Sequence, residues 1–230
     1  MGRFMNIQSF GQMHNGVLFI HNEHQTAWFT EDSGKIHPHE LKKVKVFNCK
    51  NPLALLQKIS AVWGSTVEDL QIIQCTGLIS LRECAFTKLE RFELGDVRSF
   101  SDSLFAELES MCQESLKTLS VWSCEEFTSL NQRFPRLEHV VFTGSSLDDS
   151  GLKQLSQVNA KTIKKLDLSG TNVTDFTICD EFLLLENLET DIGSFRGSSA
   201  NKSTQVPHKP DTKKCSCYNK IAEAFNRLFH

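Results

Sequence analysis

Histidine and cysteine are the residues of this chain whose chemistry suggests metal binding or catalysis. Two closely spaced histidine pairs, His21 with His24 and His37 with His39, are candidates because the imidazole of histidine binds metals. No Cys-x-x-Cys or matched second pair completes a site at ligand spacing. We therefore predict no metal or cofactor site, and we interpret these histidines as solvent-facing residues of a hairpin and a loop. Five of the eight histidines fall in the first 39 residues: His14, His21, His24, His37 and His39.

A catalytic cysteine needs a base within hydrogen-bond reach and an electropositive setting. His139 is the only histidine between residues 41 and 195, on a predicted strand next to that of Trp122. Cys124 falls where a predicted strand ends, in a structural position. The sequence also contains no phosphate-cradling glycine loop and no paired-carboxylate motif. We predict that the chain is not an enzyme.

A Cys-x-Cys pair near the carboxyl end, Cys215 and Cys217, follows Lys213 and Lys214 and precedes an amphipathic stretch. Two acyl chains beside basic residues are enough to anchor a tail to a membrane. Two alternatives stay open: the cysteines are unmodified thiols, or the stretch docks on the open edge of the last repeat. Lipidation of this pair is the only route to a membrane that the sequence offers.

The sequence contains six segments that share one pattern, and this repeat determines where the residues above lie in the fold. Apolar residues stand at the first, fourth and sixth places, and a small residue or valine stands at the ninth. Such a period suits one strand plus one helix or turn per repeat. A degraded seventh copy starts at Leu188. The six segments are 41–49, 67–75, 89–97, 116–124, 137–145 and 163–171.

The ninth place follows each strand, where the chain turns and frees backbone groups. Cysteine at this place behaves as a small hydrophobe with weak hydrogen bonding. We therefore predict that Cys49, Cys75 and Cys124 are buried, reduced and free of metal. Val97, Ser145 and Thr171 occupy the same place in the other copies.

The register resembles the leucine-rich repeat, and more narrowly its cysteine-containing class. Residues 166–175 (LDLSGTNVTD) and 146–152 (SLDDSGL) carry the resemblance best. It implies an α/β solenoid over residues 41–195, with a curved parallel sheet and with helices and turns on the convex side. The class is best known from substrate-receptor subunits of ubiquitin ligases that also carry an F-box. No F-box-like segment is visible in residues 1–40.

The flanking segments differ from the repeats in composition. Residues 1–40 predict an N-terminal β-hairpin cap, in which Val17–Ile20 and Thr26–Phe29 flank a polar turn. Residues 196–214 have the composition of a disordered linker. Residues 215–230 predict a short amphipathic C-terminal segment. Within the repeats, helices are expected at 52–63, 103–111 and 148–157.

Charge and hydropathy limit the classes of partner. A net charge of −3 argues against nucleic-acid binding, which needs a dense basic face. The longest apolar run near the start, Gly16–Ile20, is too short for a signal peptide or a membrane span. We expect the chain in the cytosol or nucleus.

The exposed face of the strands is the best candidate site. Side chains alternate along a strand, so the third, fifth and seventh places point away from the core. Large apolar and aromatic residues there need a cover, which is a protein partner or the chain's own hairpin or tail. A partner-binding module is therefore the first hypothesis, with a ubiquitin-ligase substrate receptor and a membrane-tethered scaffold as alternatives. The candidate partner-binding residues are Lys45, Phe47, Gln71, Ile73, Arg91, Glu93, Trp122, His139 and Val141.

Overall fold

The computed structural model describes residues 12–14, 16–21, 41–77, 79–101, 103–191 and 193–196. All of them belong to one compact unit, Met1–Arg196. The linker and amphipathic segment expected at 196–214 and 215–230, with Cys215 and Cys217, fall outside the described residues apart from Arg196.

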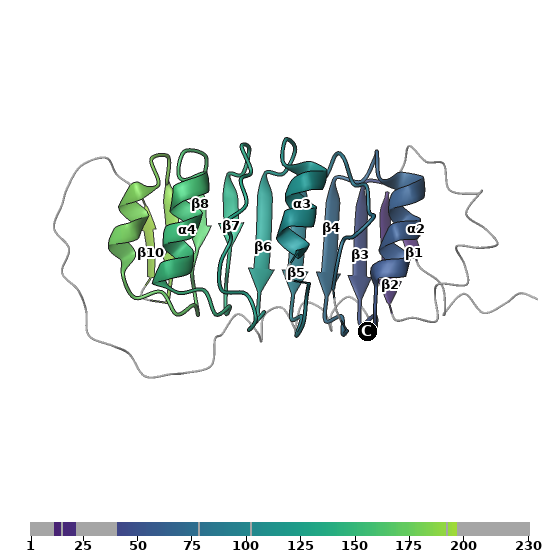
Figure 1. Cartoon of the computed structure of the whole chain (residues 1–230), viewed down its shortest axis with the longest axis horizontal. Coiled ribbons are helices and arrows are strands. Elements are labelled where there is room, and N and C mark those ends of the chain that lie inside the picture. The colour runs from purple at the N-terminus through teal and green to yellow at the C-terminus, as the bar shows by residue number, and fades with distance from the viewer. Residues whose placement is uncertain are drawn as a thin grey trace, which may run out of the picture. The chain divides into compact units, whose positions relative to one another are not determined.

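A single ten-stranded sheet forms the unit, and its spatial order follows the order of the chain. Strands β2 to β9 run parallel to their neighbours, whereas β1 and β10 pair antiparallel with β2 and β9. Figure 1 shows the strands side by side. They are β1 (Gln12–His14), β2 (Val17–His21), β3 (Lys43–Phe47), β4 (Asp69–Ile73), β5 (Arg91–Gly95), β6 (Thr118–Trp122), β7 (His139–Val141), β8 (Lys165–Asp167), β9 (Asn187–Thr190) and β10 (Gly193–Arg196).

The register of the repeats is the predicted one. The fourth places face one another across the whole sheet: Val44, Leu70, Phe92, Leu119, Val140 and Leu166. Each of these six side chains is at most 1% exposed, and together with the first and sixth places they form the core. The predicted α/β solenoid with a parallel sheet is therefore confirmed.

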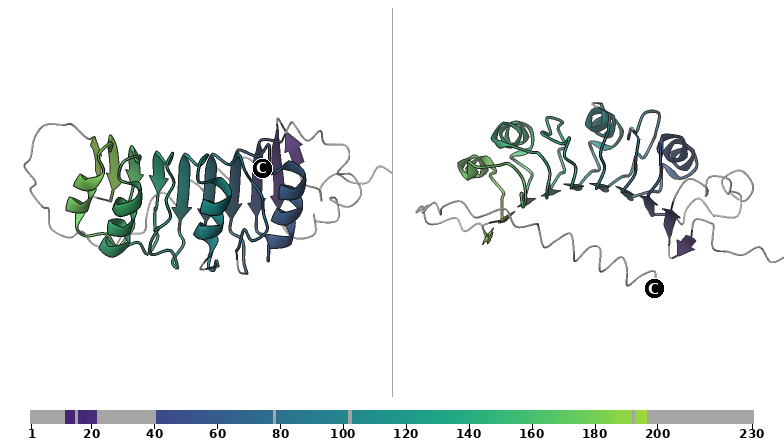
Figure 2. Two further views of the ribbon diagram at one scale, coloured as in Figure 1. Left: turned by 45° about the horizontal axis from the view of Figure 1, so that its top comes forward. Right: turned by 90° about the horizontal axis from the view of Figure 1, so that it is seen from below.

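Helices cover one face of the sheet, on its convex side, and leave the opposite face to the strands (Figure 2). They are α2 (Leu53–Trp63), α3 (Leu104–Cys112) and α4 (Asp149–Asn159), close to the predicted positions, and a 3₁₀ helix, η4 (Phe176–Glu181). Asp148 is the N-cap of α4, and its carboxylate accepts a hydrogen bond from Gly151 N at 2.9 Å. The shorter repeats after Cys75 and Cys124 have turns in place of a helix.

Every repeat strand is followed by a residue with positive φ at the eighth place. Glycine adopts this left-handed conformation without strain, and asparagine and aspartate adopt it more readily than most other residues. The turn it produces carries the chain from the strand towards the convex side. The six residues are Asn48, Gln74, Asp96, Ser123, Gly144 and Gly170, with φ between 49° and 70°.

Each end of the sheet carries one antiparallel strand. The antiparallel partner of β2 is β1, which precedes it, whereas the expected partner Thr26–Phe29 lies outside the described residues. Strand β2 also continues the parallel ladder, with Leu18 opposite Val44. At the other end Leu188 pairs with Leu166, so it occupies a fourth place. The seventh copy therefore begins at Leu185, three residues earlier than predicted. The sequence pattern misplaced its start because Thr190 and Gly193 stand at its sixth and ninth places, so the usual repeat residues are missing there.

Candidate partner-binding face

The strand face opposite the helices, called the concave face here, consists of the third-, fifth- and seventh-place side chains of β3 to β8. Most of the candidate residues on it are half-buried, and Arg91 is exposed. Phe47 is an exception at 7% exposed, which is contrary to the exposure that alternation predicts. Its ring stands in register between the seventh-place residues His21 and Ile73. His21 itself lies at the sheet surface, with its Nε2 3.2 Å from Asn48 Nδ2.

A charged triad crosses three strands at the third places. Asp69 Oδ2 lies 2.8 Å from Lys43 Nζ and 3.1 Å from Arg91 Nε. The Asp69 side chain is 6% exposed, whereas that of Arg91 is 51% exposed. A buried carboxylate is tolerable only when it is paired in this way. The triad fixes both cations and leaves one net positive charge, mostly on the exposed guanidinium.

Lys45 lies beside this triad at a fifth place, with Gln71 and Glu93 following it on β4 and β5. Burial, and then the charge of Lys43, lowers the pKa of Lys45, while Glu93 and Asp69 act in the opposite direction. Its Nζ lies 5.5 Å from the centroid of the Phe19 ring. A carboxylate brought by a partner would therefore meet a partly desolvated ammonium group here.

Trp122 dominates the middle of the face, because the neighbouring strand has a glycine at the same place. A Cβ built on Gly95 would lie 2.2 Å from two carbons of the Trp122 indole, so only glycine lets the ring lie across β5. The indole Nε1 donates a hydrogen bond of 2.9 Å to Glu93 Oε1. On the neighbouring strand β7, His139 and Val141, both half-buried, face Thr118 and Ser120 in register, and Thr143 is the seventh-place residue that follows Trp122. The ring is thus held in place and keeps part of its surface exposed.

The fifth places at the carboxyl-terminal end of the sheet are acidic, whereas the third place of β8 is the exposed Lys165. Asp167 accepts hydrogen bonds from Thr143 Oγ1 at 3.1 Å and from Ser169 N at 2.9 Å. The exposed Glu189 follows Asp167 in register on β9. The concave face therefore has the charged triad and Lys45 on β3 to β5, Trp122 on β6, and Asp167 beside the exposed Lys165 on β8.

Sequence reasoning missed two features of this face. Asp69 was not a candidate, yet it is the buried group that orders Lys43 and Arg91. The signal was present in the alternation of charge at successive third places. Gly95 was not a candidate either, although it is the residue that lets the Trp122 indole lie across β5.

The three predicted structural cysteines are buried at 2% exposure or less. The Cys75 thiol lies 3.6 Å from Val46 O, and that of Cys124 lies 3.7 Å from Leu94 O; both carbonyls are at sixth places of the preceding strand. Burial raises the pKa of Cys124 to about 11, whereas a hydrogen bond with Cys49 lowers that of Cys75. The six cysteines of the described part are free thiols. Within it, no cluster of three metal-ligating side chains occurs.

We expect the buried thiols to be inert in the folded protein, since a thiol must be exposed and ionised to react. In a variant with Cys84, Cys215 and Cys217 replaced by serine, five of the eight cysteines remain. Ellman's reagent should label none of the five within minutes in native buffer and all five in denaturant. Rapid labelling of Cys49, Cys75 or Cys124 in native buffer, or bound zinc by elemental analysis, would contradict this.

Comparison with solved structures identifies the architecture. An internalin from Listeria monocytogenes superimposes with a TM-score of 0.53, at 13% sequence identity, over 76% of this chain. The match spans 47% of the internalin chain, about half of its length. The fold is a leucine-rich-repeat solenoid. No family model and no curated protein matches the sequence of this solenoid. In the described residues, none of its helices is both long and apolar enough to cross a bilayer.

Proposed function

We propose that this solenoid is a non-enzymatic module that binds a protein partner on its concave face, around Trp122. The observation that carries the proposal is the indole, which lies over Gly95 and donates a hydrogen bond to Glu93. A rigid, partly exposed tryptophan is the type of group that dominates binding energies at interfaces. Solenoids offer such extended concave surfaces because their repeats are stacked in one dimension.

Trp122→Ala should weaken binding of the partner roughly thirtyfold, or about 2 kcal/mol, because a central aromatic anchor is lost. Affinity purification with mass spectrometry identifies the partner, and titration of the two purified proteins by calorimetry gives the dissociation constant. Trp122→Phe keeps an aromatic ring over Gly95 and should lose less affinity. Lys153→Ala, on helix α4 of the convex side, should bind as the natural sequence does. Equal affinities for Trp122→Ala and Lys153→Ala would contradict the proposal.

The competing cover for this face is the chain itself, and quenching of tryptophan fluorescence separates the two. The chain has three tryptophans; Trp63 is 0% exposed, and Trp28 lies outside the described residues. In a Trp28→Phe variant, emission that acrylamide quenches comes from Trp122. We expect ready quenching in the free protein and protection when the partner is added. A shielded indole in the free protein would mean that the chain covers its own face.

The cysteine-containing class of repeat remains part of the proposal. It is supported by Cys75 and Cys124, whose thiols contact equivalent carbonyls of the preceding strand. The resemblance favours a partner in a ubiquitin-ligase complex, in which the solenoid would receive the substrate, in the cytosol or nucleus. Co-purification with a cullin-type ligase tests this role. The alternative of a lipidated tail at Cys215 and Cys217 predicts membrane partition that hydroxylamine reverses.

A further inference from the structure

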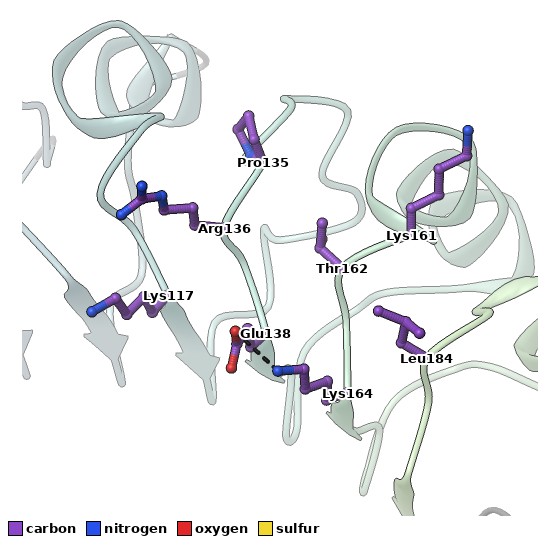
Figure 3. Close-up of a pocket in the computed structure, with 8 residues that line it drawn as sticks. All are labelled: Lys117, Pro135, Arg136, Glu138, Lys161, Thr162, Lys164 and Leu184. Atoms are coloured by element: carbon purple, nitrogen blue, oxygen red, sulfur yellow. Dashed lines mark ion pairs between the residues drawn. The ribbon is translucent and has the colours of Figure 1, made fainter.

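We propose a second binding site, at the edge of the sheet, that takes an acidic peptide segment of a partner protein. It is a pocket of about 380 Å³ on the side where the strands begin, and it is separate from the concave face. Figure 3 shows its lining residues on the segments that enter β6, β7, β8 and β9, with Glu138 and Lys164 pointing toward each other and the heads of Arg136 and Lys161 pointing to opposite sides. The lining residues are Lys117, Pro135, Arg136, Glu138, Lys161, Thr162, Lys164 and Leu184.

The repeat itself positions the floor of this edge pocket. Lys117, Glu138 and Lys164 are the second-place residues of three successive repeats. Glu138 N donates to Lys117 O at 2.9 Å, and Lys164 N donates to Glu138 O at 2.8 Å. These backbone hydrogen bonds hold the three side chains one strand spacing apart. The floor is therefore as rigid as the sheet.

The pocket has an excess of positive charge, with four cations and one carboxylate. Lys164 Nζ is paired with Glu138 Oε1 at 3.1 Å, and Lys117 Nζ with Glu90 Oε1 at 2.7 Å. Arg136 and Lys161 are exposed, and neither forms an ion pair with any residue that the structure describes. They are the two groups free to receive carboxylates.

A structural role at the end of helix α4 explains the presence of only one of these two cations. Lys161 lies two residues beyond Asn159, where the carbonyl groups at the carboxyl end of the helix favour positive charge. Arg136 precedes a strand and has no such partner. Its guanidinium can bind a carboxylate through two hydrogen bonds, which a lysine cannot do.

An apolar wall beside the cations narrows the class of ligand. Leu184 lines the pocket at 49% exposed, and its neighbour Leu183 is 70% exposed. They are two of the three large hydrophobic residues that are exposed in the described part, the third being Val62. A hydrogen bond of 3.0 Å from Leu183 N to Ala160 O holds this loop against the end of α4. Free phosphate has no group to cover these leucines, whereas a peptide with an apolar residue beside its carboxylates does.

The charge pattern of the edge favours a peptide over a lipid surface. Second-place carboxylates alternate with the lysines, at Glu90, Glu138 and Glu186. A uniformly anionic membrane needs a cluster of basic residues without intervening acids. A peptide can place its carboxylates at Arg136 and Lys161 and its apolar side chain on Leu184, clear of those acids.

Fluorescence anisotropy with a labelled synthetic peptide containing several glutamates and two leucines tests the site on the full chain. Arg136→Gln with Lys161→Gln should weaken binding about tenfold, equivalent to about 1.4 kcal/mol. Leu184→Ser should weaken it severalfold, and raising the salt concentration should weaken it further. The matched control is Lys58→Gln with Lys88→Gln, two exposed lysines outside the pocket with the same loss of charge. It should bind as the natural sequence does.

Four outcomes would overturn the proposal: no binding of the peptide, equal weakening in the control pair, equal binding of a peptide with glutamine in place of glutamate, or capture by anionic vesicles in preference to the peptide. Circular dichroism of each variant checks that the fold is intact. We expect it to be, because substitutions of exposed residues usually change stability little. Trp122→Ala should bind the acidic peptide normally. Failure of this site and failure of the concave-face proposal are therefore distinguishable.

Discussion

Leu119→Ala is expected to lower the free energy of unfolding by about 2–5 kcal/mol, as large-to-small changes in a packed core do. Leu119 is 0% exposed at the fourth place of β6, with Phe92 and Val140 beside it on the adjacent strands. The lost stability has two parts: the missing apolar contacts of the leucine side chain and the cavity that remains because the surrounding repeats relax only partly. Urea denaturation followed by circular dichroism measures it.

The matched control is the next residue along the same strand. Ser120 is half-buried on the concave face, and Ser120→Ala should change stability by no more than about 0.5 kcal/mol. Similar shifts of the urea midpoint for the two variants would mean that the assignment of inner and outer faces is wrong.

Gly151→Ala is expected to destabilise the protein by about 3 kcal/mol, the upper part of the range for overpacking. The usual effect inside a helix has the opposite sign, because alanine is favoured over glycine by about 1 kcal/mol. Here the added Cβ would lie 2.0 Å from Thr128 O and 2.8 Å from Leu147 Cδ1. Helix α4 would have to move away from the turn of the preceding repeat.

Ser150→Ala on the same helix provides the comparison. Ser150 is exposed, so alanine there should be neutral or stabilising by a few tenths of a kcal/mol. In thermal melts, the melting temperature should fall for Gly151→Ala and stay the same or rise slightly for Ser150→Ala. A higher melting temperature for Gly151→Ala would show that α4 does not pack as closely as the structure has it.

The parallel sheet and its register follow from the sequence because each repeat repeats the same local physics. Apolar side chains two apart along a strand, at Leu119 and Val121 for example, can be buried together only on one face. Six copies of that constraint leave a single alignment. The ends lack it: the copy beginning at Leu185 has Thr190 at its sixth place, and β1 has no repeat pattern.

The candidate face was predictable in outline only. Alternation along each strand names the residues that point outwards, and it places Trp122 and Arg91 correctly on that face. It does not describe contacts between strands, which decide that Asp69 is buried and that the indole lies over Gly95. Such contacts depend on which residues face one another in register, so they become visible only when columns are read across the repeats.

The antiparallel strands at the two ends of the sheet bear on the behaviour of the chain at high concentration. A stack of parallel repeats with bare ends would be a template on which further copies could polymerise. Strand β1 has three residues and β10 has four, and both run against the direction of the strands they cover. Short, reversed edge strands are a poor surface for adding another parallel repeat. We therefore expect these two end strands to disfavour end-to-end polymerisation of the solenoid.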